Sequence, residues 1–505
     1  MKNILQYLEK TVEKYGNKTA IIEEEKKCSY LELQTTSKKV GTCLTKYIKT
    51  KEPVIVFMEK GINSIYSFFG TVYAGGFYVL LNPELPIERL KNILEVSKAK
   101  VIVTDQEHYN LANEIADLKI LKIEDILETT IDDETLSIIR SKALDVDPLY
   151  ANFTSGSTGI PKGVLICHRS VIDFINEFTS KFDINHDDII ANQAPFDFDV
   201  SVKDIYSSIF TGATLLIIPR KLFSKPADLL DYICNNNATT MIWAVSALCL
   251  ITTFHALEYK VPTSVNKILF SGEVMPLKHL KQWIEKLPNA LFVNLYGPTE
   301  ITCNCTYHIV DKSLEYEKQI PIGKAFDNED VFLLDENNKF ITEKESIGEI
   351  CVRGTALALG YYNNKEQTQK QFMQNPLNDS YIDIIYKTGD LAYLGKDDNY
   401  YFCGRKDFQI KHMGHRIELE EIEIAINKYK EIERVCCIYD DAKSKLYAFY
   451  IGNIDKKQLK RNLQEQLPVF MVPNVLRQIE EMPLTKNGKI DRKLILNNEK
   501  EKKYI

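Results

Sequence analysis

The stretch Thr154-Ser-Gly-Ser-Thr-Gly-Ile-Pro-Lys-Gly163 holds four hydroxyl side chains, three glycines and one lysine. Glycines let the backbone approach a ligand closely, hydroxyl groups donate hydrogen bonds, and Lys162 adds positive charge, so the stretch suits a polyphosphate. The Walker pattern is absent because Lys162 lies between a proline and a glycine, and a P-loop fold is therefore not implied. The alternative to a phosphate loop is a surface turn rich in serine and glycine.

Together with five other stretches, this loop resembles the adenylate-forming superfamily, which includes acyl-CoA synthetases, luciferases and the amino-acid-adenylating enzymes of peptide synthetases. The five stretches follow the order of the family's motifs, and the resemblance covers almost the whole chain. They are Asn294-Leu-Tyr-Gly-Pro-Thr-Glu300, Tyr386-Lys-Thr-Gly-Asp390, Gly404-Arg-Lys-Asp407, Lys411-His-Met-Gly-His-Arg-Ile-Glu418 and Asn487-Gly-Lys-Ile-Asp491. The resemblance implies two half-reactions: a carboxylate attacks the α-phosphate of ATP to give an acyl adenylate and pyrophosphate, and a thiol then accepts the acyl group.

Short apolar runs alternate with stretches of helical spacing, which favours an α/β fold whose largely parallel sheets are covered by helices on both faces. The predicted strands include residues 54–58, 101–103, 215–218, 291–295, 435–439 and 446–451, and the predicted helices include 87–94 and 419–429. After residue 404 the pattern changes to an amphipathic helix followed by short strands. We therefore predict a large amino-terminal core of parallel or mixed sheets, 1–404, and a small, mobile α+β domain, 405–505. The resemblance implies a hinge near Asp407.

The composition is that of an ordinary globular protein of 505 residues, with 45% hydrophobic and 26% charged residues. Against 63 Lys and Arg stand 70 Asp and Glu, so no overall basic field exists to hold nucleic acid or an anionic membrane. Eleven cysteines without a C-x-x-C pair argue against a zinc knuckle and a disulfide framework. Charged residues interrupt the first fifteen positions, which predicts an amphipathic helix instead of a signal peptide. We expect a cytoplasmic protein without stable membrane insertion.

The resemblance implies which residues hold ATP and Mg²⁺. Glu300 matches a glutamate associated with Mg²⁺, a hard oxygen ligand for an ion shared with phosphates, and Thr299 matches a contact to the α-phosphate. Tyr296 matches the residue against the adenine, and Asp390 the carboxylate that accepts from both ribose hydroxyls. Considered one at a time, Gly297-Pro298 could equally form a structural turn and Asp390 could equally cap a helix, without any role in binding the nucleotide. The implied nucleotide contacts are Thr154, Ser155, Gly156, Ser157, Thr158, Lys162, Asn294, Leu295, Tyr296, Gly297, Pro298, Asp390, Phe402 and Arg405.

Lys489 lies near the lysine-rich end of the chain, where a lysine is ordinarily a solvated charge. The resemblance instead implies that Lys489 is catalytic, together with Thr299 and Glu300, and bridges the substrate carboxylate and the α-phosphate as charge develops. To reach a site in the other domain, the carboxy-terminal domain must rotate, and residues 411–416 match the loop that faces the thiol after that rotation.

The stretch Pro195-Phe-Asp-Phe-Asp-Val-Ser-Val-Lys203 resembles the amino-acid-activating branch, in which an aspartate at the place of Asp199 pairs with the substrate's α-ammonium. A buried carboxylate is costly unless paired, and the alternative is that Asp199 caps the helix that follows. The other pocket positions are mostly small or aliphatic, which indicates a small substrate side chain; they are Val200, Lys203, Ala244, Leu269, Ser271, Leu295, Cys303 and Asn304. Lys203 could pair with Asp199 four residues away, point to solvent, or meet an acidic or polar substrate side chain.

The chain contains no signature of a carrier, condensation or thioesterase domain, so we expect a free-standing enzyme that serves a separate phosphopantetheinylated carrier protein. A basic patch would guide such an acidic partner; it comprises Lys411, His412, His415 and Arg416. Several stretches look closest to the D-alanyl carrier protein ligases, which makes D-alanine the leading candidate substrate. Those ligases typically have cysteine at the place of Ser271 and an uncharged residue at the place of Lys203, so another small or polar amino acid, such as serine or alanine, is the alternative.

Two other functions compete with amino-acid activation. A coenzyme A ligase shares the same motifs and is the alternative within the superfamily. A kinase or a regulatory ATPase is the rival from another class, but the sequence lacks P-loop and kinase signatures. A kinase or a regulatory ATPase would also leave Asp199 and Lys489 without a role.

Overall fold

The structure is a computed structural model that describes residues 2–156, 159–440, 443–484 and 490–501. The chain divides into two compact units. The first comprises Met1–Pro83, Ser97–Asn152 and Gly163–Lys406, and the second comprises Glu84–Val96, Phe153–Lys162 and Asp407–Ile505. The predicted boundary between residues 404 and 405, and the hinge at Asp407, stay predictions.

Two large sheets form the frame of the first unit. The nine-stranded sheet has the order β15-β14-β13-β12-β11-β9-β10-β1-β2, with its inner strands parallel. Its strands are β1 Thr19–Glu23, β2 Lys26–Ser29, β9 Ile189–Asn192, β10 Thr214–Ile217, β11 Thr240–Ala244, β12 Lys267–Ser271, β13 Leu291–Tyr296, β14 Thr306–Ile309 and β15 Lys324–Ala325. The seven-stranded sheet has the order β18-β8-β7-β4-β3-β5-β6. Its strands are β3 Pro53–Phe57, β4 Phe77–Leu80, β5 Val101–Thr104, β6 Lys119–Lys122, β7 Pro148–Thr154, β8 Lys162–Cys167 and β18 Gly360–Tyr361.

A third, antiparallel sheet completes the first unit, and the sequence did not predict it. It pairs β16-β17-β20-β19, with β21 added beside β20. Its strands are β16 Glu329–Leu334, β17 Ile347–Gly354, β19 Phe372–Gln374, β20 Ile384–Leu394 and β21 Tyr400–Arg405.

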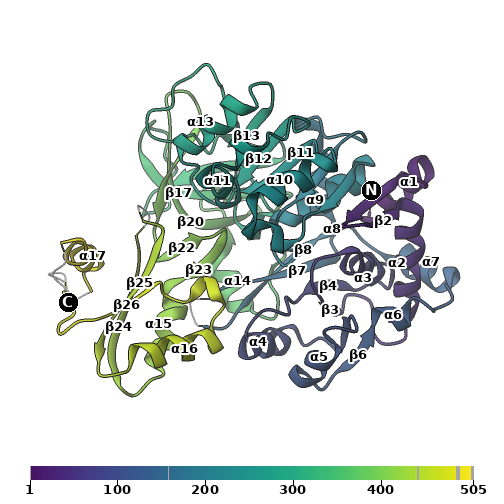
Figure 1. Ribbon diagram of the computed structural model, residues 1–505, viewed down its shortest axis with the longest axis horizontal. Helices are drawn as coiled ribbons and strands as arrows, with labels where there is room; N and C mark the ends of the chain where they lie inside the picture. The colour runs from purple at the N-terminus through teal and green to yellow at the C-terminus, as the bar shows by residue number, and fades with distance from the viewer. Residues whose placement is uncertain (1, 157–158, 441–442, 485–489, 502–505) are drawn as a thin grey trace. The chain divides into compact units, whose positions relative to one another are not determined.

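Helices cover the nine-stranded sheet on both faces, which explains its nearly continuous apolar strands. In β11, Ile242 belongs to one hydrophobic core, while Met241 and Trp243 belong to another on the opposite face. Figure 1 shows α10, α11 and α13 beside β11, β12 and β13. The helices of this unit are α1 Leu5–Tyr15, α2 Tyr30–Leu44, α3 Ile62–Tyr73, α5 Tyr109–Ile115, α6 Ile123–Ile126, α7 Asp133–Lys142, α8 His168–Lys181, α9 Val200–Thr211, α10 Pro226–Asn235, α11 Val245–Thr253, α12 Ala256–Tyr259, α13 Leu277–Lys286 and α14 Lys365–Gln371.

The far end of α9 is bonded to the first thirty residues of the chain. The helix ends at Gly212, whose φ of 81° is left-handed and suits glycine. Thr11 Oγ1 donates to the Ile209 carbonyl over 2.7 Å, and Tyr30 Oη donates to the Ser208 carbonyl over 2.7 Å. Lys18 Nζ donates to the Gly212 carbonyl over 2.6 Å, where a cation is favourable to the helix dipole. The Ile209 carbonyl in the last turn of the helix thereby receives a donor from distant sequence. The Ser208 carbonyl already accepts from the Gly212 N–H over 2.9 Å and receives a second donor.

The second unit contains α4 Ile87–Ser97 for most of its length and the predicted mixture of helices and strands after residue 407. A hairpin of β22 Gln409–His412 and β23 His415–Glu418 leads into α15 Leu419–Asn427. A three-stranded sheet follows, with α16 and α17; these elements are β24 Ile432–Asp440, β25 Lys445–Gly452, α16 Lys456–Gln466, β26 Val475–Gln478 and α17 Arg492–Lys500. Its core joins apolar residues of α15, α16 and the sheet.

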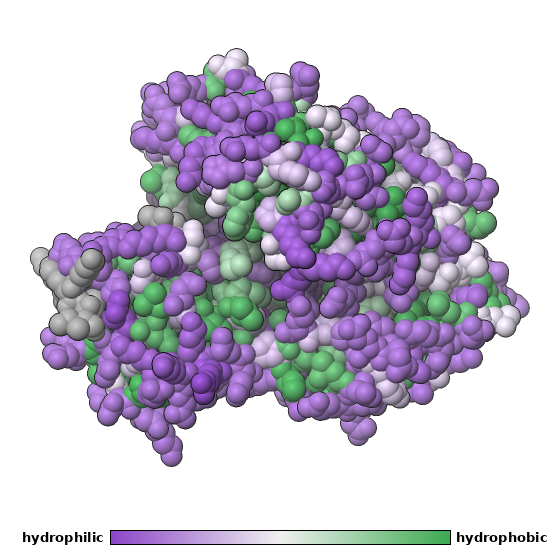
Figure 2. Space-filling view, viewed as in Figure 1, coloured by the Kyte–Doolittle hydropathy of each residue, from purple (hydrophilic) through white to green (hydrophobic). Residues whose placement is uncertain are grey.

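Most of the surface on the face shown in Figure 2 is hydrophilic, and the apolar residues there form small separate groups. Among the residues that the structure describes, no helix has both the length and the apolar composition needed to cross a membrane.

A buried histidine ties the start of the chain to α8 and should make stability depend on pH. Burial lowers the pKa of His168 to about 3, while its ring nitrogens face Asn3 Nδ2 at 3.3 Å and the Ile4 N–H at 3.4 Å. In the unfolded chain the His168 imidazole binds a proton near pH 6.5, whereas in the folded protein it stays neutral at that pH. The free energy of unfolding therefore falls as pH drops below 6.5. Between pH 6.5 and 4.5 we expect the parent to lose about 2 kcal/mol more unfolding free energy than His168→Gln. Urea denaturation at both pH values measures the difference; identical pH slopes in the two proteins would contradict it.

Candidate active site

A buried carboxylate, that of Asp390 on β20, is bonded to two other predicted nucleotide contacts. Tyr296 Oη donates to Asp390 Oδ2 over 2.5 Å, and Arg405 Nη1 donates to Asp390 Oδ1 over 2.5 Å. Asp390 lies within a strand and is 4% exposed, so the helix-cap explanation is wrong. Burial, assisted by the charge of Asp390, raises the pKa of Tyr296 well above its usual value, and its hydroxyl therefore remains a donor.

Other residues predicted to contact the nucleotide surround this carboxylate. The Phe402 ring lies 6.4 Å from the Tyr296 ring, so the two aromatic side chains are neighbours. Asn294 Nδ2 donates to the Pro321 carbonyl over 2.8 Å, which makes Asn294 a support for the adjoining segment. A Cβ atom on Gly297 would lie 2.5 Å from the Asn304 Cα atom. Glycine is therefore required there, and it brings the nucleotide motif against residues predicted for the amino-acid pocket.

Glu300 is buried at the short helix η2, Thr299–Ile301, and is held by a residue that the sequence did not point to. Its Oε1 atom accepts from Tyr361 Oη over 2.7 Å, and its carbonyl accepts from the Ala358 N–H over 2.8 Å. Only 1% of Glu300 is exposed. No set of three or more His, Cys, Asp or Glu in the described part of the chain is arranged to hold a metal ion, so a cation at Glu300 would need other oxygen ligands.

Asp199 lies at the N-cap position of α9, yet its side chain makes no capping hydrogen bond. The helix-cap explanation of Asp199 is therefore wrong. Cys303 Sγ donates to the Asp199 carbonyl over 3.1 Å, and this contact places the 303–304 segment beside the start of α9. Burial raises the pKa of Cys303 well above its usual value, and the Asp199 charge adds to the effect.

Lys203, one turn further along α9, is fully buried, so the solvent-facing orientation is wrong. Its Nζ atom donates to Asn304 Oδ1 over 2.6 Å, and the two residues are 0% and 1% exposed. The remaining predicted pocket residues come from the start of α9, from the neighbouring strands β11, β12 and β13 toward their carboxyl ends, where ligands of open α/β sheets bind, and from the segment that follows η2. They are Val200, Ala244, Leu269, Ser271, Leu295 and Cys303, and all but the half-buried Ala244 are buried.

A polar network beside this pocket was missed by sequence reasoning. Lys60 Nζ donates to the Gln193 carbonyl over 3.0 Å and to Asn192 Oδ1 over 3.2 Å, while Asn192 Nδ2 donates to Asp204 Oδ2 over 2.6 Å. Burial lowers the pKa of Lys60 to about 7 and raises the pKa of Asp204 to about 7. Gln193 Oε1 in turn accepts from the Ala244 N–H over 3.2 Å. The sequence signal that could have indicated this network is Asp204, a charged residue in the largely apolar sequence of α9.

In the second unit, the phosphate loop is bonded to acidic residues. The Gly156 N–H donates to Glu421 Oε2 over 3.3 Å, and Lys162 Nζ lies 3.5 Å from Glu418 Oε1. Ser155 Oγ donates to a carbonyl of β23 over 2.9 Å. The loop therefore offers an N–H donor and a cation to the carboxylates of Glu421 and Glu418, and its role as a phosphate loop stays a prediction. Ser157, Thr158 and Lys489 lie outside the described residues.

The predicted basic patch on the β22–β23 hairpin is smaller than expected. His412 is 7% exposed, its Nδ1 atom lies 3.1 Å from Tyr439 Oη, and burial lowers the pKa of His412. His412 is therefore neutral near pH 7. The His415 ring stacks on Phe470 at 3.6 Å between ring centres. Lys411 and Arg416 remain the permanent charges of the patch.

Residues 8–362 match the AMP-binding enzyme family. The chain belongs to this family. Zwittermicin A synthase ZmaJ of Bacillus cereus is 32% identical to this AMP-binding enzyme over 506 residues, which cover 97% of the chain and 94% of ZmaJ. Surfactin synthase subunit 1 of Bacillus subtilis (strain 168) is 31% identical over 98% of the chain, but the chain spans only 14% of that protein.

Solved structures share the fold of this AMP-binding enzyme. The Vibrio cholerae adenylation domain AlmE, in complex with glycyl-adenosine-5'-phosphate, matches with a TM-score of 0.86 at 21% identity over 99% of the chain and 98% of AlmE. A nonribosomal peptide synthetase protein containing adenylation and PCP domains matches with a TM-score of 0.85 at 22% identity, over 98% of the chain and 84% of that protein. The predicted fold class and superfamily are confirmed. The closer resemblance to D-alanyl carrier protein ligases stays a prediction.

Proposed function

We propose that this enzyme activates an amino acid with ATP as an aminoacyl adenylate and transfers the aminoacyl group to the phosphopantetheine thiol of a separate carrier protein. The observation that carries the proposal is the position of Asp199. Its carboxylate does not cap α9, and Asp199 lies next to Cys303 among predicted substrate contacts that are mostly small or aliphatic. A carboxylate in that place suits the α-ammonium of an amino acid.

The chain's own residues would bring the two anionic reactants together, which is the main obstacle in this chemistry. Asp390 would accept from the ribose hydroxyls while Arg405 and Tyr296 hold it in place. The phosphate loop would direct Lys162 and its N–H groups at the phosphates. Glu300, held by Tyr361, would supply a hard oxygen ligand to Mg²⁺, and the ion would neutralise phosphate charge when bound. Lys489 would bridge the substrate carboxylate and the α-phosphate.

Asp390→Asn should weaken ATP binding by about 10- to 100-fold, because it removes a charge-assisted acceptor for the ribose and the counter-charge of Arg405. Tyr296→Phe is the matched control, since it removes one hydrogen bond to Asp390 but keeps the aromatic ring, and it should cost less than about 10-fold. Calorimetric titration of each folded variant with ATP measures both effects. Unchanged ATP affinity in Asp390→Asn would remove Asp390 from the nucleotide site.

The amino acid has two candidates. D-alanine follows from the resemblance to D-alanyl carrier protein ligases and from the small, aliphatic lining. The fully buried Lys203 favours the second candidate, another small amino acid with a polar side chain, because a buried ammonium and the Asn304 amide bonded to it form a polar environment. Amino-acid-dependent exchange between ATP and pyrophosphate, measured across L and D amino acids, decides between them. Formation of ADP instead of AMP would contradict an adenylating enzyme.

The second half-reaction is tested with a purified carrier. Radiolabelled amino acid should load onto a holo-carrier protein and should fail to load onto a carrier whose modifiable serine is replaced. Loading should slow as salt rises, because Lys411 and Arg416 would guide an acidic carrier through a screened attraction. Equally efficient transfer to free coenzyme A would replace the carrier assignment with a coenzyme A ligase.

A further inference from the structure

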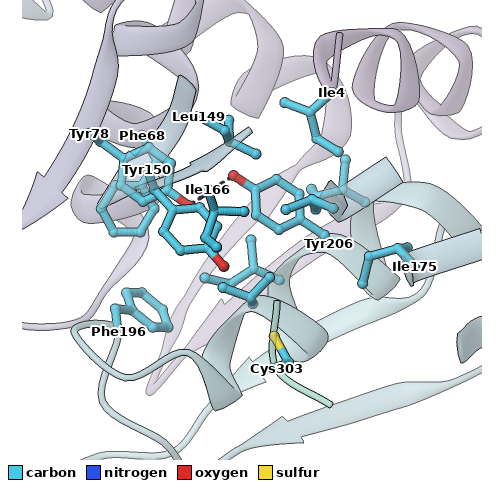
Figure 3. Close-up of a cluster of buried hydrophobic side chains, with 14 of the residues drawn as sticks. Ile4, Phe68, Tyr78, Leu149, Tyr150, Ile166, Ile175, Phe196, Tyr206 and Cys303 are labelled. Atoms are coloured by element: carbon cyan, nitrogen blue, oxygen red, sulfur yellow. Dashed lines mark hydrogen bonds between the residues drawn. The ribbon is translucent and has the colours of Figure 1, made fainter. Parts of the chain in front are cut away.

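Near the predicted substrate contact Cys303 lies a buried hydroxyl group that the proposed function leaves unexplained (Figure 3). Tyr150 on β7 is 1% exposed, and its Oη atom has no hydrogen-bond partner among the described residues. Buried polar groups are nearly always hydrogen-bonded. One without a partner costs about 1 to 3 kcal/mol of stability, so a protein that keeps such a hydroxyl gains something from it.

The Tyr150 hydroxyl is directed away from the other tyrosines around it. Tyr78 stacks on the Tyr150 ring at 5.7 Å, and its hydroxyl lies 2.9 Å from that of Tyr206. Figure 3 shows these two hydroxyls facing each other, whereas the Tyr150 hydroxyl points toward the side of the cluster where Cys303 lies. Burial raises the pKa of Tyr150, and the nearby Cys303 and Asp199 add to the effect. The hydroxyl is therefore close to the start of α9 and the 303–304 segment.

Asn304 contributes a second group of defined chemistry to the same place. A lysine can only donate, so the Asn304 atom 2.6 Å from Lys203 Nζ is the carbonyl oxygen. The amide orientation is thereby fixed, and the Asn304 Nδ2 group presents two N–H donors to the rest of its surroundings. Lys203 is a positioning residue for this amide. Beside these donors, the aliphatic side chains of Val200, Leu269 and Leu295 offer no polar group.

We propose that the substrate's side chain ends in an oxygen that accepts hydrogen bonds from Tyr150 Oη and Asn304 Nδ2. A hydroxyl, a carboxamide and a carboxylate share this chemistry, so the substrate class is a polar amino acid with an oxygen on its side chain. The inference rests on the proposed activation of an amino acid and makes it more specific. A methyl group in the same place would leave both donors without a partner, and sites built to bond a polar group discriminate strongly against the analogue that lacks it.

The test compares amino acids of matched shape in exchange between ATP and pyrophosphate. Serine is paired with 2-aminobutyrate, and asparagine and aspartate are each paired with leucine, in both enantiomers. We expect the parent to favour the oxygen-bearing member of at least one pair by about 100-fold or more in kcat/KM. Tyr150→Phe should reduce that ratio by about 10-fold, through a loss of activity on the oxygen-bearing member.

Tyr206→Phe is the matched control, because it removes a hydroxyl from the same cluster whose partner is Tyr78. It should leave the substrate ratio unchanged, which separates loss of a substrate contact from general loss of packing. Should Tyr150→Phe not fold, Asn304→Leu carries the same test and should lower the ratio in the same direction. If a folded Tyr150→Phe or Asn304→Leu variant kept the parent's ratio of kcat/KM between the oxygen-bearing and the apolar amino acid, the proposal would be overturned.

The outcomes also separate this inference from the function on which it rests. Exchange supported by 2-aminobutyrate or leucine as well as by their polar partners would overturn the oxygen contact and leave amino-acid activation standing. Exchange with no amino acid of either hand would overturn both.

Discussion

Asp199→Ala should lower kcat/KM for the amino acid by about 100-fold or more, because the substrate's ammonium would be held in the pocket without its counter-charge. Removing one partner of a buried ion pair typically costs about 3 to 5 kcal/mol, and the lower end applies because Asp199 is only partly buried. ATP affinity should remain that of the parent. Exchange between ATP and pyrophosphate over a range of amino-acid concentrations measures the loss.

A neighbouring aspartate provides the control for that experiment. Asp197→Ala removes the same charge from the same loop and should retain kcat/KM within a few-fold. If Asp199→Ala activated its amino acid as well as the parent, or if the parent preferred acids that lack an amine, the amino-acid function would give way to a coenzyme A ligase.

Lys489→Ala should lower kcat for adenylation by about 100- to 1,000-fold while KM for ATP changes little. The charge of Lys489 would matter most as charge develops on the α-phosphate, and such an interaction appears in kcat more than in binding. The exposed Lys493 on α17 is the control, and Lys493→Ala should behave as the parent. Transfer to the carrier from a chemically supplied aminoacyl adenylate should survive in Lys489→Ala. Adenylation within a few-fold of the parent would remove Lys489 from the mechanism.

The parallel sheets could be predicted because their strands are buried on both faces and read as continuous apolar runs. The run at 291–295, for example, is strand β13 at Leu291–Tyr296. The antiparallel sheet was missed for the opposite reason. In β20 buried residues alternate with more exposed ones, and the motif residues Lys387 and Asp390 interrupt its apolar pattern. The stretch was therefore interpreted as a functional motif and was not predicted to be a strand.

Motifs nominated the side chains of the candidate site, but they did not indicate the residues that hold those side chains. Tyr361 supports Glu300 from 61 positions away, and Lys60 reaches Asn192 across 132 positions. Such contacts depend on which strands are neighbours, and spacing along one chain does not contain that information. The sequence did not show whether the Lys203 side chain is buried or exposed for the same reason. Which faces of α9 are covered by other elements depends on the folded molecule.

The bonds at the far end of α9 tie the amino-acid site to the order in which the molecule folds. Thr11, Lys18 and Tyr30 satisfy carbonyls that lie 178 to 198 positions later in the chain. Contacts of such long range form late, after much chain entropy has been lost. The helix that presents Asp199 is therefore completed only when the beginning of the chain has docked. A short amino-terminal deletion should then abolish amino-acid binding while leaving the second unit's fold intact, and substrate binding becomes a direct measure of whether the whole first unit has assembled.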